Sequence, residues 1–170
     1  MIRPADELDH SEIHGVLNTA FHPSRFESCL FEAAKSSDVD HADWVAEEDG
    51  RVVGYILYTP AYKEGEPIGF HLGPHAVHPD FQKQGIGADL IATTLQVPPI
   101  RSSSVFVFGE PGLYERFGFS EVATAHCPYD PGNDHFRALR WSEASKSFTI
   151  GYSKIFEEAE RHLADGRTLD

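Results

Sequence analysis

Two segments with the two-residue period of β-strands flank an Asp49-Gly50 pair, and this pattern constrains the fold more than any other feature of the chain. The segments are residues 44–47 and 51–58, and Asp-Gly is a preferred two-residue hairpin turn. A polar turn over residues 63–67 and a third extended segment, residues 68–77, follow. The sequence therefore predicts an antiparallel meander of three strands.

Two amphipathic helices are predicted ahead of this meander, over residues 13–21 and 26–33. In both segments the apolar residues recur three and four positions apart, as on one face of a helix. Each segment is preceded by an Asp or Ser with a Glu three positions later, the pattern of a capping box. These pairs are Asp9 with Glu12 and Ser24 with Glu27.

A strand–helix–strand step is predicted after the meander. Residues 84–95 are apolar on most of their helical surface, and the continuous apolar run 105–108 is typical of an interior strand. A connection of this length favours parallel pairing between residues 68–77 and 105–108. The remaining expected elements are a short helix at 113–116, strands at 138–141 and 148–152, and a helical tail within 154–170.

Length and charge set limits on the class of protein. A chain of 170 residues fits one domain, and its net charge of −13 disfavours nucleic acid and anionic membranes as partners. Cys29 and Cys127 are expected to be buried thiols in a reducing compartment. We find neither a signal peptide nor an apolar stretch long enough to span a bilayer, so we expect a cytoplasmic monomer or homodimer.

Residues 71–89 carry the pattern most closely tied to chemistry. An apolar strand ends at Val77, and a glycine-containing loop opens directly into a helix, whose N-terminus is a ready anion site. Gly85 and Gly87 let a phosphate approach the backbone, and Lys83 adds a cation. A dinucleotide fingerprint would need a third glycine at Leu90, and the chain contains no Gly-Lys pair of a phosphate-binding P-loop.

The remaining pattern, Gln82-x-x-Gly85-x-Gly87 after a strand, resembles the acetyl-CoA pyrophosphate loop of the GNAT superfamily of N-acetyltransferases. Tyr114-x-x-x-Gly118-Phe119 follows about thirty residues later and resembles a second family segment. The sequences of both segments are particularly similar to those of the YhbS-like branch, and the similarity covers about residues 1–140. It implies an α/β fold (α+β by some conventions), with a mixed, mostly antiparallel sheet of about six or seven strands and helices on both faces.

The resemblance also implies acetyl-CoA as cosubstrate, without a metal, and a set of site residues. Backbone groups at the end of the third strand would pair with the pantetheine arm, and the loop amides would hold the pyrophosphate. Tyr114 would protonate the leaving thiolate, while the amide of Val77 or a neighbour polarises the thioester carbonyl. The implied cofactor-binding residues are Ala76, Val77, His78, Gln82, Lys83, Gln84, Gly85, Ile86, Gly87 and Ala88.

Three histidines in or beside the third strand raise two further hypotheses. His71 and His75 would lie about 13 Å apart and His78 would face the other way, which disfavours a shared metal. His71 is the first candidate for the general base that deprotonates the acceptor amine, with His75, Glu110 and water as alternatives. His75 also stands where close relatives usually carry an aliphatic residue.

The function implied is direct acetyl transfer from acetyl-CoA to an amine of a small molecule or peptide. The alternative is a regulatory domain that binds acyl-CoA without turnover. The sequence does not name the acceptor, although its acidic loops favour a cation such as a polyamine, an aminoglycoside or a basic peptide.

Overall fold

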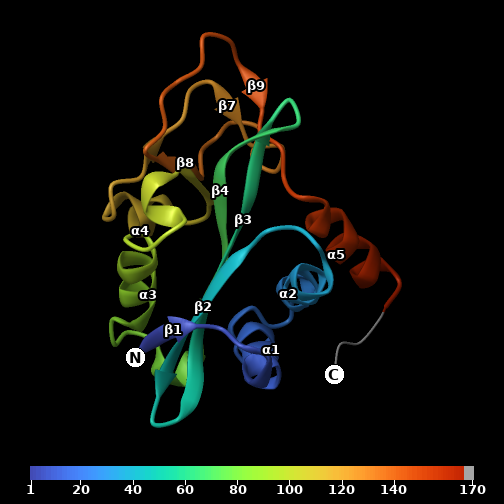
Figure 1. The fold of residues 1–170 in the computed structure, drawn as a ribbon, viewed down its shortest axis with the longest axis vertical. Helices are drawn as coiled ribbons and strands as arrows, with labels where there is room; N and C mark the ends of the chain where they lie inside the picture. Colours follow the sequence, from blue (N-terminus) through green and yellow to red (C-terminus); the bar gives the residue numbers. More distant parts are fainter. Residues whose placement is uncertain (167–170) are drawn as a thin grey trace.

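The computed structural model describes residues 1–166 and contains a seven-stranded sheet in the order β1-β2-β3-β4-β5-β8-β6 (Figure 1). Within this sheet β4 and β5 are parallel and all other neighbours are antiparallel. The strands are β1 Ile2–Pro4, β2 Ala42–Glu48, β3 Arg51–Lys63, β4 Glu66–Val77, β5 Val105–Phe108, β6 Ser120–Glu121 and β8 Phe136–Leu139. A separate parallel pair joins β7 Ala125–His126 to β9 Phe148–Thr149.

Helices cover both faces of the sheet, as predicted. One face carries α1 His10–Ala20, α2 Phe26–Ser36 and α5 Lys154–Ala164, and the other carries α3 Ile86–Thr94, with α4 Pro111–Glu115 beside it (Figure 1). Short 3-10 turns at Glu7–Asp9, Pro79–Phe81 and Ile100–Ser102 complete the helical elements. None of the helices within residues 1–166 has the length and apolar content needed to cross a bilayer.

The predicted meander is confirmed, and both of its turns are tight. Asp49 and Gly50 have positive φ values of 50° and 77° between the paired residues Glu48 and Arg51. The second turn consists of Glu64 and Gly65, with φ values of 50° and 82°. Positive φ at both turn positions matches the twist of the flanking strands. Because that turn takes two residues, β3 and β4 are longer than the periodicity predicted.

The predicted capping box of Asp9 and Glu12 is wrong. The Asp9 carboxylate instead accepts two hydrogen bonds from the Arg3 guanidinium, both 2.8 Å, and one from the Asp6 amide. Glu12 accepts from the amide of Val52 on β3. Both carboxylates therefore tie the first helix to the sheet. At the second helix the prediction is closer, because the Ser24 hydroxyl accepts from the Phe26 amide and donates to Glu27.

The C-terminal third of the chain departs from the predicted boundaries. The strand expected at 138–141 spans Phe136–Leu139, and the one expected at 148–152 is reduced to β9. Strands β1, β6 and β7 were not predicted, because two or three residues are too few to show a period. The predicted tail contains α5, and its residues 167–170 lie outside the described part.

The pairing of β4 with β5 is short, and this opens the sheet at its centre. The parallel register covers Phe70–Leu72 against Val105–Val107. Beyond Leu72, β4 continues to Val77 along β3, whereas β5 ends at Phe108. The two strands therefore part over the last five residues of β4. The predicted thiols Cys29 and Cys127 are both buried and free.

Candidate active site

The edge of β4 that faces away from β3 presents backbone groups where the strands part. The His78 amide donates to Val53 of β3 at 2.7 Å. Since antiparallel backbone groups alternate in direction, Ala76 also faces β3, while His75 and Val77 face the open edge. The expectation that Ala76 offers its own backbone groups to a pantetheine arm is therefore corrected in favour of its two neighbours.

The loop after β4 is fastened to the strand and ends in an uncapped helix. The Gln82 side-chain amide donates to the Val77 carbonyl at 2.9 Å. Gly85 is the N-cap of α3, with φ of 86°, and no atom of residues 1–166 outside its chain neighbours lies within 4 Å of the position its Cβ would take. The amides of residues 86–88 lack intrahelical acceptors because they form the first turn. Together they form a cradle suited to an anion, with Lys83 beside it.

His75 links this cradle to the centre of the sheet. Its Nε2 donates to the Gly87 carbonyl at 3.1 Å, and its ring stands 3.3 Å from the position a Gly87 Cβ would take. Burial lowers the pKa of His75 to about 4. The imidazole is therefore neutral at pH 7, with the proton on Nε2 and an acceptor at Nδ1. Its ring meets that of Tyr114 edge to face at 6.5 Å between centroids.

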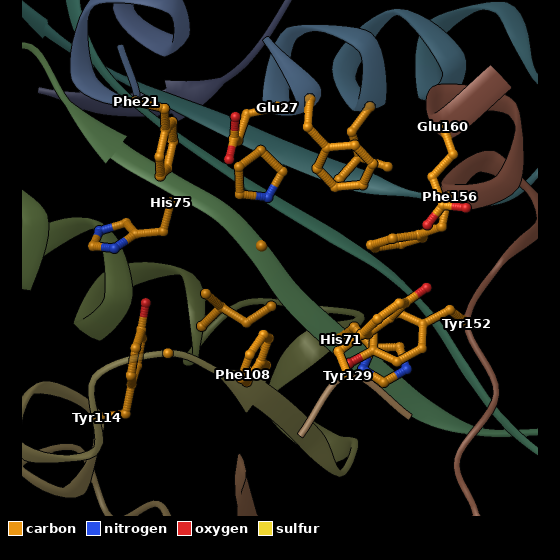
Figure 2. Close-up of a pocket in the computed structure, with 16 residues that line it drawn as sticks. Phe21, Glu27, His71, His75, Phe108, Tyr114, Tyr129, Tyr152, Phe156 and Glu160 are labelled. Carbon is orange, nitrogen blue, oxygen red and sulfur yellow. The ribbon is translucent and has the colours of Figure 1, made fainter. Parts of the chain in front are cut away.

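Tyr114 lies on α4, directly after β5, with 8% of its surface exposed. Its ring packs on Phe119 at 5.8 Å and passes so close to Gly109 that a Cβ there would be 2.9 Å away. The hydroxyl points towards His75 (Figure 2). Burial alone raises the pKa of Tyr114 to about 12, which agrees with a hydroxyl that no group within residues 1–166 engages.

A cavity of about 590 Å³ lies where the strands part, and Tyr114, His75 and His71 all contribute to its wall (Figure 2). It continues past the sheet to α2 and α5. The residues that line it are Phe21, Phe26, Glu27, Leu30, His71, Leu72, Gly73, Pro74, His75, Phe108, Gly109, Tyr114, Tyr129, Tyr152, Phe156 and Glu160.

His71 lies at the end of the cavity remote from Tyr114 (Figure 2). Its Nε2 donates to the Gly151 carbonyl at 2.9 Å, and its ring stacks on Tyr152 with 3.7 Å between centroids and 4° between planes. Burial lowers the pKa of His71 to about 4. His71 is therefore a neutral ring in the cavity wall, with Nδ1 as its remaining acceptor.

The cavity-lining residues of α2, α5 and the C-terminal loops were not predicted as site residues from the sequence. The sequence predicts Glu27 as the partner of Ser24 in a capping box, but within residues 1–166 its carboxylate accepts from the Ser24 hydroxyl and not from a backbone amide. Tyr129 and Tyr152 carry no motif. Their contribution depends on contacts between distant segments, which a local period does not reveal. Within residues 1–166, no group of three or more His, Cys, Asp or Glu side chains is arranged to hold a metal ion.

A central parallel strand pair that parts, an amide cradle at the following helix and a buried phenol beside the opening together define the class of GNAT-fold acyltransferases. Residues 40–121 match the family model described as an acetyltransferase (GNAT) domain. The chain belongs to the GNAT family of N-acetyltransferases.

Relatives support this assignment at the level of sequence. The chain is 32% identical over 123 residues to the uncharacterized N-acetyltransferase YjhQ of Escherichia coli K12, covering 69% of this chain and 68% of that protein. It is 23% identical to the uncharacterized N-acetyltransferase YhbS of the same strain over 95% of this chain and 99% of that one.

Solved structures agree. The structure of E. coli YhbS in complex with CoA superposes with a TM-score of 0.83 at 25% identity, covering 92% of this chain and 91% of that one. A GNAT family acetyltransferase from Brucella melitensis, solved with acetyl-CoA, gives 0.75 at 28% identity, with coverage of 92% and 97%. The predicted family and fold are confirmed.

Proposed function

We propose that this protein transfers an acetyl group from acetyl-CoA directly to the amine of a small molecule or peptide, with Tyr114 as the general acid. The observation that carries the proposal is the Tyr114 phenol beside a cavity that opens where β4 and β5 part. A proton donor at this place stands next to the strand edge along which a thioester would bind.

The cosubstrate would bind along the open edge of β4 and the loop after it. The amides of residues 83–88 would hold the pyrophosphate, and Lys83 would supply a positive charge. The backbones of His75 and Val77 would pair with the pantetheine arm, while Gln82 and His78 fix the loop. The two structural relatives were solved in complex with CoA and acetyl-CoA, which supports acetyl-CoA as the cosubstrate.

The chemistry follows from these positions. The acceptor nitrogen attacks the thioester carbonyl, forming a C–N bond and a tetrahedral intermediate whose oxygen an edge amide of β4 stabilises. Collapse breaks the C–S bond, and the Tyr114 proton passes to the departing sulfur. The acceptor nitrogen loses its proton through water to Nδ1 of His71, which lies remote from Tyr114. Because the pKa of His71 is low, the imidazole passes this proton on to solvent, and a proton from solvent restores the Tyr114 phenol. His71 keeps its base role as part of this proposal.

An assay of cosubstrate binding together with turnover tests the proposal. Acetyl-CoA should raise the melting temperature of the protein, and thiol release should depend on an added amine. Binding of acetyl-CoA with no thiol release across a broad amine panel would instead indicate an acyl-CoA-binding domain without turnover. An unchanged melting temperature at millimolar acetyl-CoA would contradict the proposed function.

A further inference from the structure

The half of the cavity remote from Tyr114 has a continuous aromatic wall, made by Phe26, His71, Tyr129, Tyr152 and Phe156. The ring of Tyr152 stacks on His71 and contacts Tyr129 and Phe156 at centroid distances of 5.0 and 4.8 Å. Phe26 of α2 meets Phe156 of α5 at 6.4 Å. The wall therefore presents apolar ring faces and edges contributed by four separate parts of the chain.

The charges at this cavity are of one sign. Glu27 and Glu160 are the acidic residues of the lining, and its two histidines are neutral at pH 7. Among the lining residues in the described part of the chain, none is a Lys or Arg. A bound group with a positive charge is therefore favoured, and one with a carboxylate or phosphate would lack a partner.

Glu27 is the better placed of the two carboxylates. It is half-buried on the first turn of α2, where the Ser24 hydroxyl donates to it at 2.7 Å and fixes its orientation. Glu160 is exposed and lies beside Phe156 at the end away from Tyr114, whereas Glu27 lies nearer to His75 (Figure 2). An ammonium group held by Glu27 would stand between the aromatic wall and the open strand edge.

We infer that the acceptor is a small primary amine with one ammonium group and an apolar, planar body, bound with its body on the aromatic wall and its nitrogen near Glu27. This inference rests on the proposed function. The cavity volume is in the range of small-molecule sites. A polyamine or an aminoglycoside would set further charged or hydroxyl groups against rings that offer them few hydrogen-bond partners.

The first test compares acceptors that differ in one property. We expect kcat/KM for 2-phenylethylamine to exceed that for phenylalanine, which adds a carboxylate, and that for spermidine, which lacks the ring, by roughly tenfold or more. A short basic peptide serves as a fourth acceptor. A preference for phenylalanine, spermidine or the peptide would overturn the inference while leaving acetyl transfer intact.

The second test removes the charge of Glu27. Glu27→Gln keeps the size and an oxygen acceptor, so we expect KM for 2-phenylethylamine to rise roughly 10- to 100-fold, with KM for acetyl-CoA unchanged. Glu157→Gln on α5 is the matched control, because Glu157 is exposed and outside the cavity lining. Equal effects of the two substitutions would overturn the inference.

Calorimetric titration of 2-phenylethylamine into the CoA-bound protein separates this inference from the proposed function. Binding that Glu27→Gln weakens, in a protein that transfers no acetyl group, would support the amine site and contradict the function. Absence of binding up to about 10 mM 2-phenylethylamine would overturn the inference.

Discussion

The surroundings of the Tyr114 hydroxyl determine what this side chain can do at neutral pH. A phenol whose pKa is raised to about 12 remains protonated throughout the physiological range. Its ring is fixed between Gly109 and Phe119, so the hydroxyl reaches the cavity in one orientation. Replacement by Phe would keep that ring packing and remove the donor alone.

We therefore expect Tyr114→Phe to lower kcat by about 10²- to 10³-fold. The dissociation constant for acetyl-CoA should change little, and the free energy of unfolding should fall by less than ~1.5 kcal/mol. Steady-state kinetics, acetyl-CoA titration and urea unfolding measure the three quantities. Near-normal turnover on the preferred acceptor would mean that the leaving thiolate takes its proton from water or another group.

We expect His71 to affect the rate without changing its own protonation state near pH 7. Since burial lowers its pKa to about 4, the imidazole is neutral at every pH from 6 to 9. A rise of the rate with pH in that range would therefore report the acceptor amine. We expect His71→Ala to lower turnover by roughly 10²-fold at pH 7 and by less at pH 9.5, where more of the acceptor is already deprotonated.

The full pH–rate profile of both proteins measures this difference. A loss of equal size at all pH values would indicate that His71 acts through its stacking on Tyr152 and its hydrogen bond to Gly151. In that case it would be a positioning residue of the cavity wall.

At the scale of elements, the loop between β4 and α3 depends on the backbone freedom of Gly85. With φ of 86°, an L-residue there is strained, and its side chain would occupy the open space above the helix amides. We expect Gly85→Val to abolish the thermal shift caused by acetyl-CoA, while the protein stays folded.

Gly65 supplies the matched control for that substitution. It has φ of 82°, equally open surroundings within the described chain, and a place in the turn between β3 and β4. Gly65→Val should therefore carry a similar backbone strain and retain the full acetyl-CoA shift, as read by differential scanning fluorimetry. A normal shift with Gly85→Val would mean that the pyrophosphate binds elsewhere.

The elements with strong local signals were predictable from sequence. The Asp49-Gly50 turn, the helical stripe of residues 13–21 and the apolar run 105–108 all have local causes, and each formed the expected element. The capping box predicted at Asp9 did not form, because the Asp9 carboxylate binds Arg3, a tertiary partner that competes with helix capping. The proposed cofactor half of the site follows one continuous segment, residues 71–89, which is why a motif could indicate it.

At the scale of the whole molecule, the half of the cavity proposed to bind the acceptor is assembled from distant segments. Rings from α2, from the loop at Tyr129 and from α5 meet there, and Gly151 pairs with Tyr62 of β3 to bring Tyr152 over His71. No short segment carries this information, so sequence patterns indicated the cosubstrate but not the shape of the acceptor site.

The two neutral imidazoles of this cavity, the buried His71 and the half-buried His75, couple the stability of the whole fold to pH. Burial lowers the pKa of His71 and of His75 from 6.5 to about 4. Below pH 6.5 these two histidines bind protons in the unfolded chain but stay unprotonated in the folded protein. The folded state therefore loses stability as the pH falls towards 4. Above pH 6.5 both histidines are neutral in the folded and in the unfolded state, so this loss of stability is absent.

We expect the free energy of unfolding to decrease steeply between pH 6.5 and 4, by roughly 3 kcal/mol for each histidine, since one pKa unit corresponds to about 1.4 kcal/mol. Urea unfolding at a series of pH values measures the slope. His71→Phe keeps a ring against Tyr152 and should remove about half of the dependence, whereas substitution of the exposed His22 by Gln should leave it unchanged. An equal slope in all three proteins would show that other groups govern the acid transition, because a histidine buried in its neutral form must lower stability in this window.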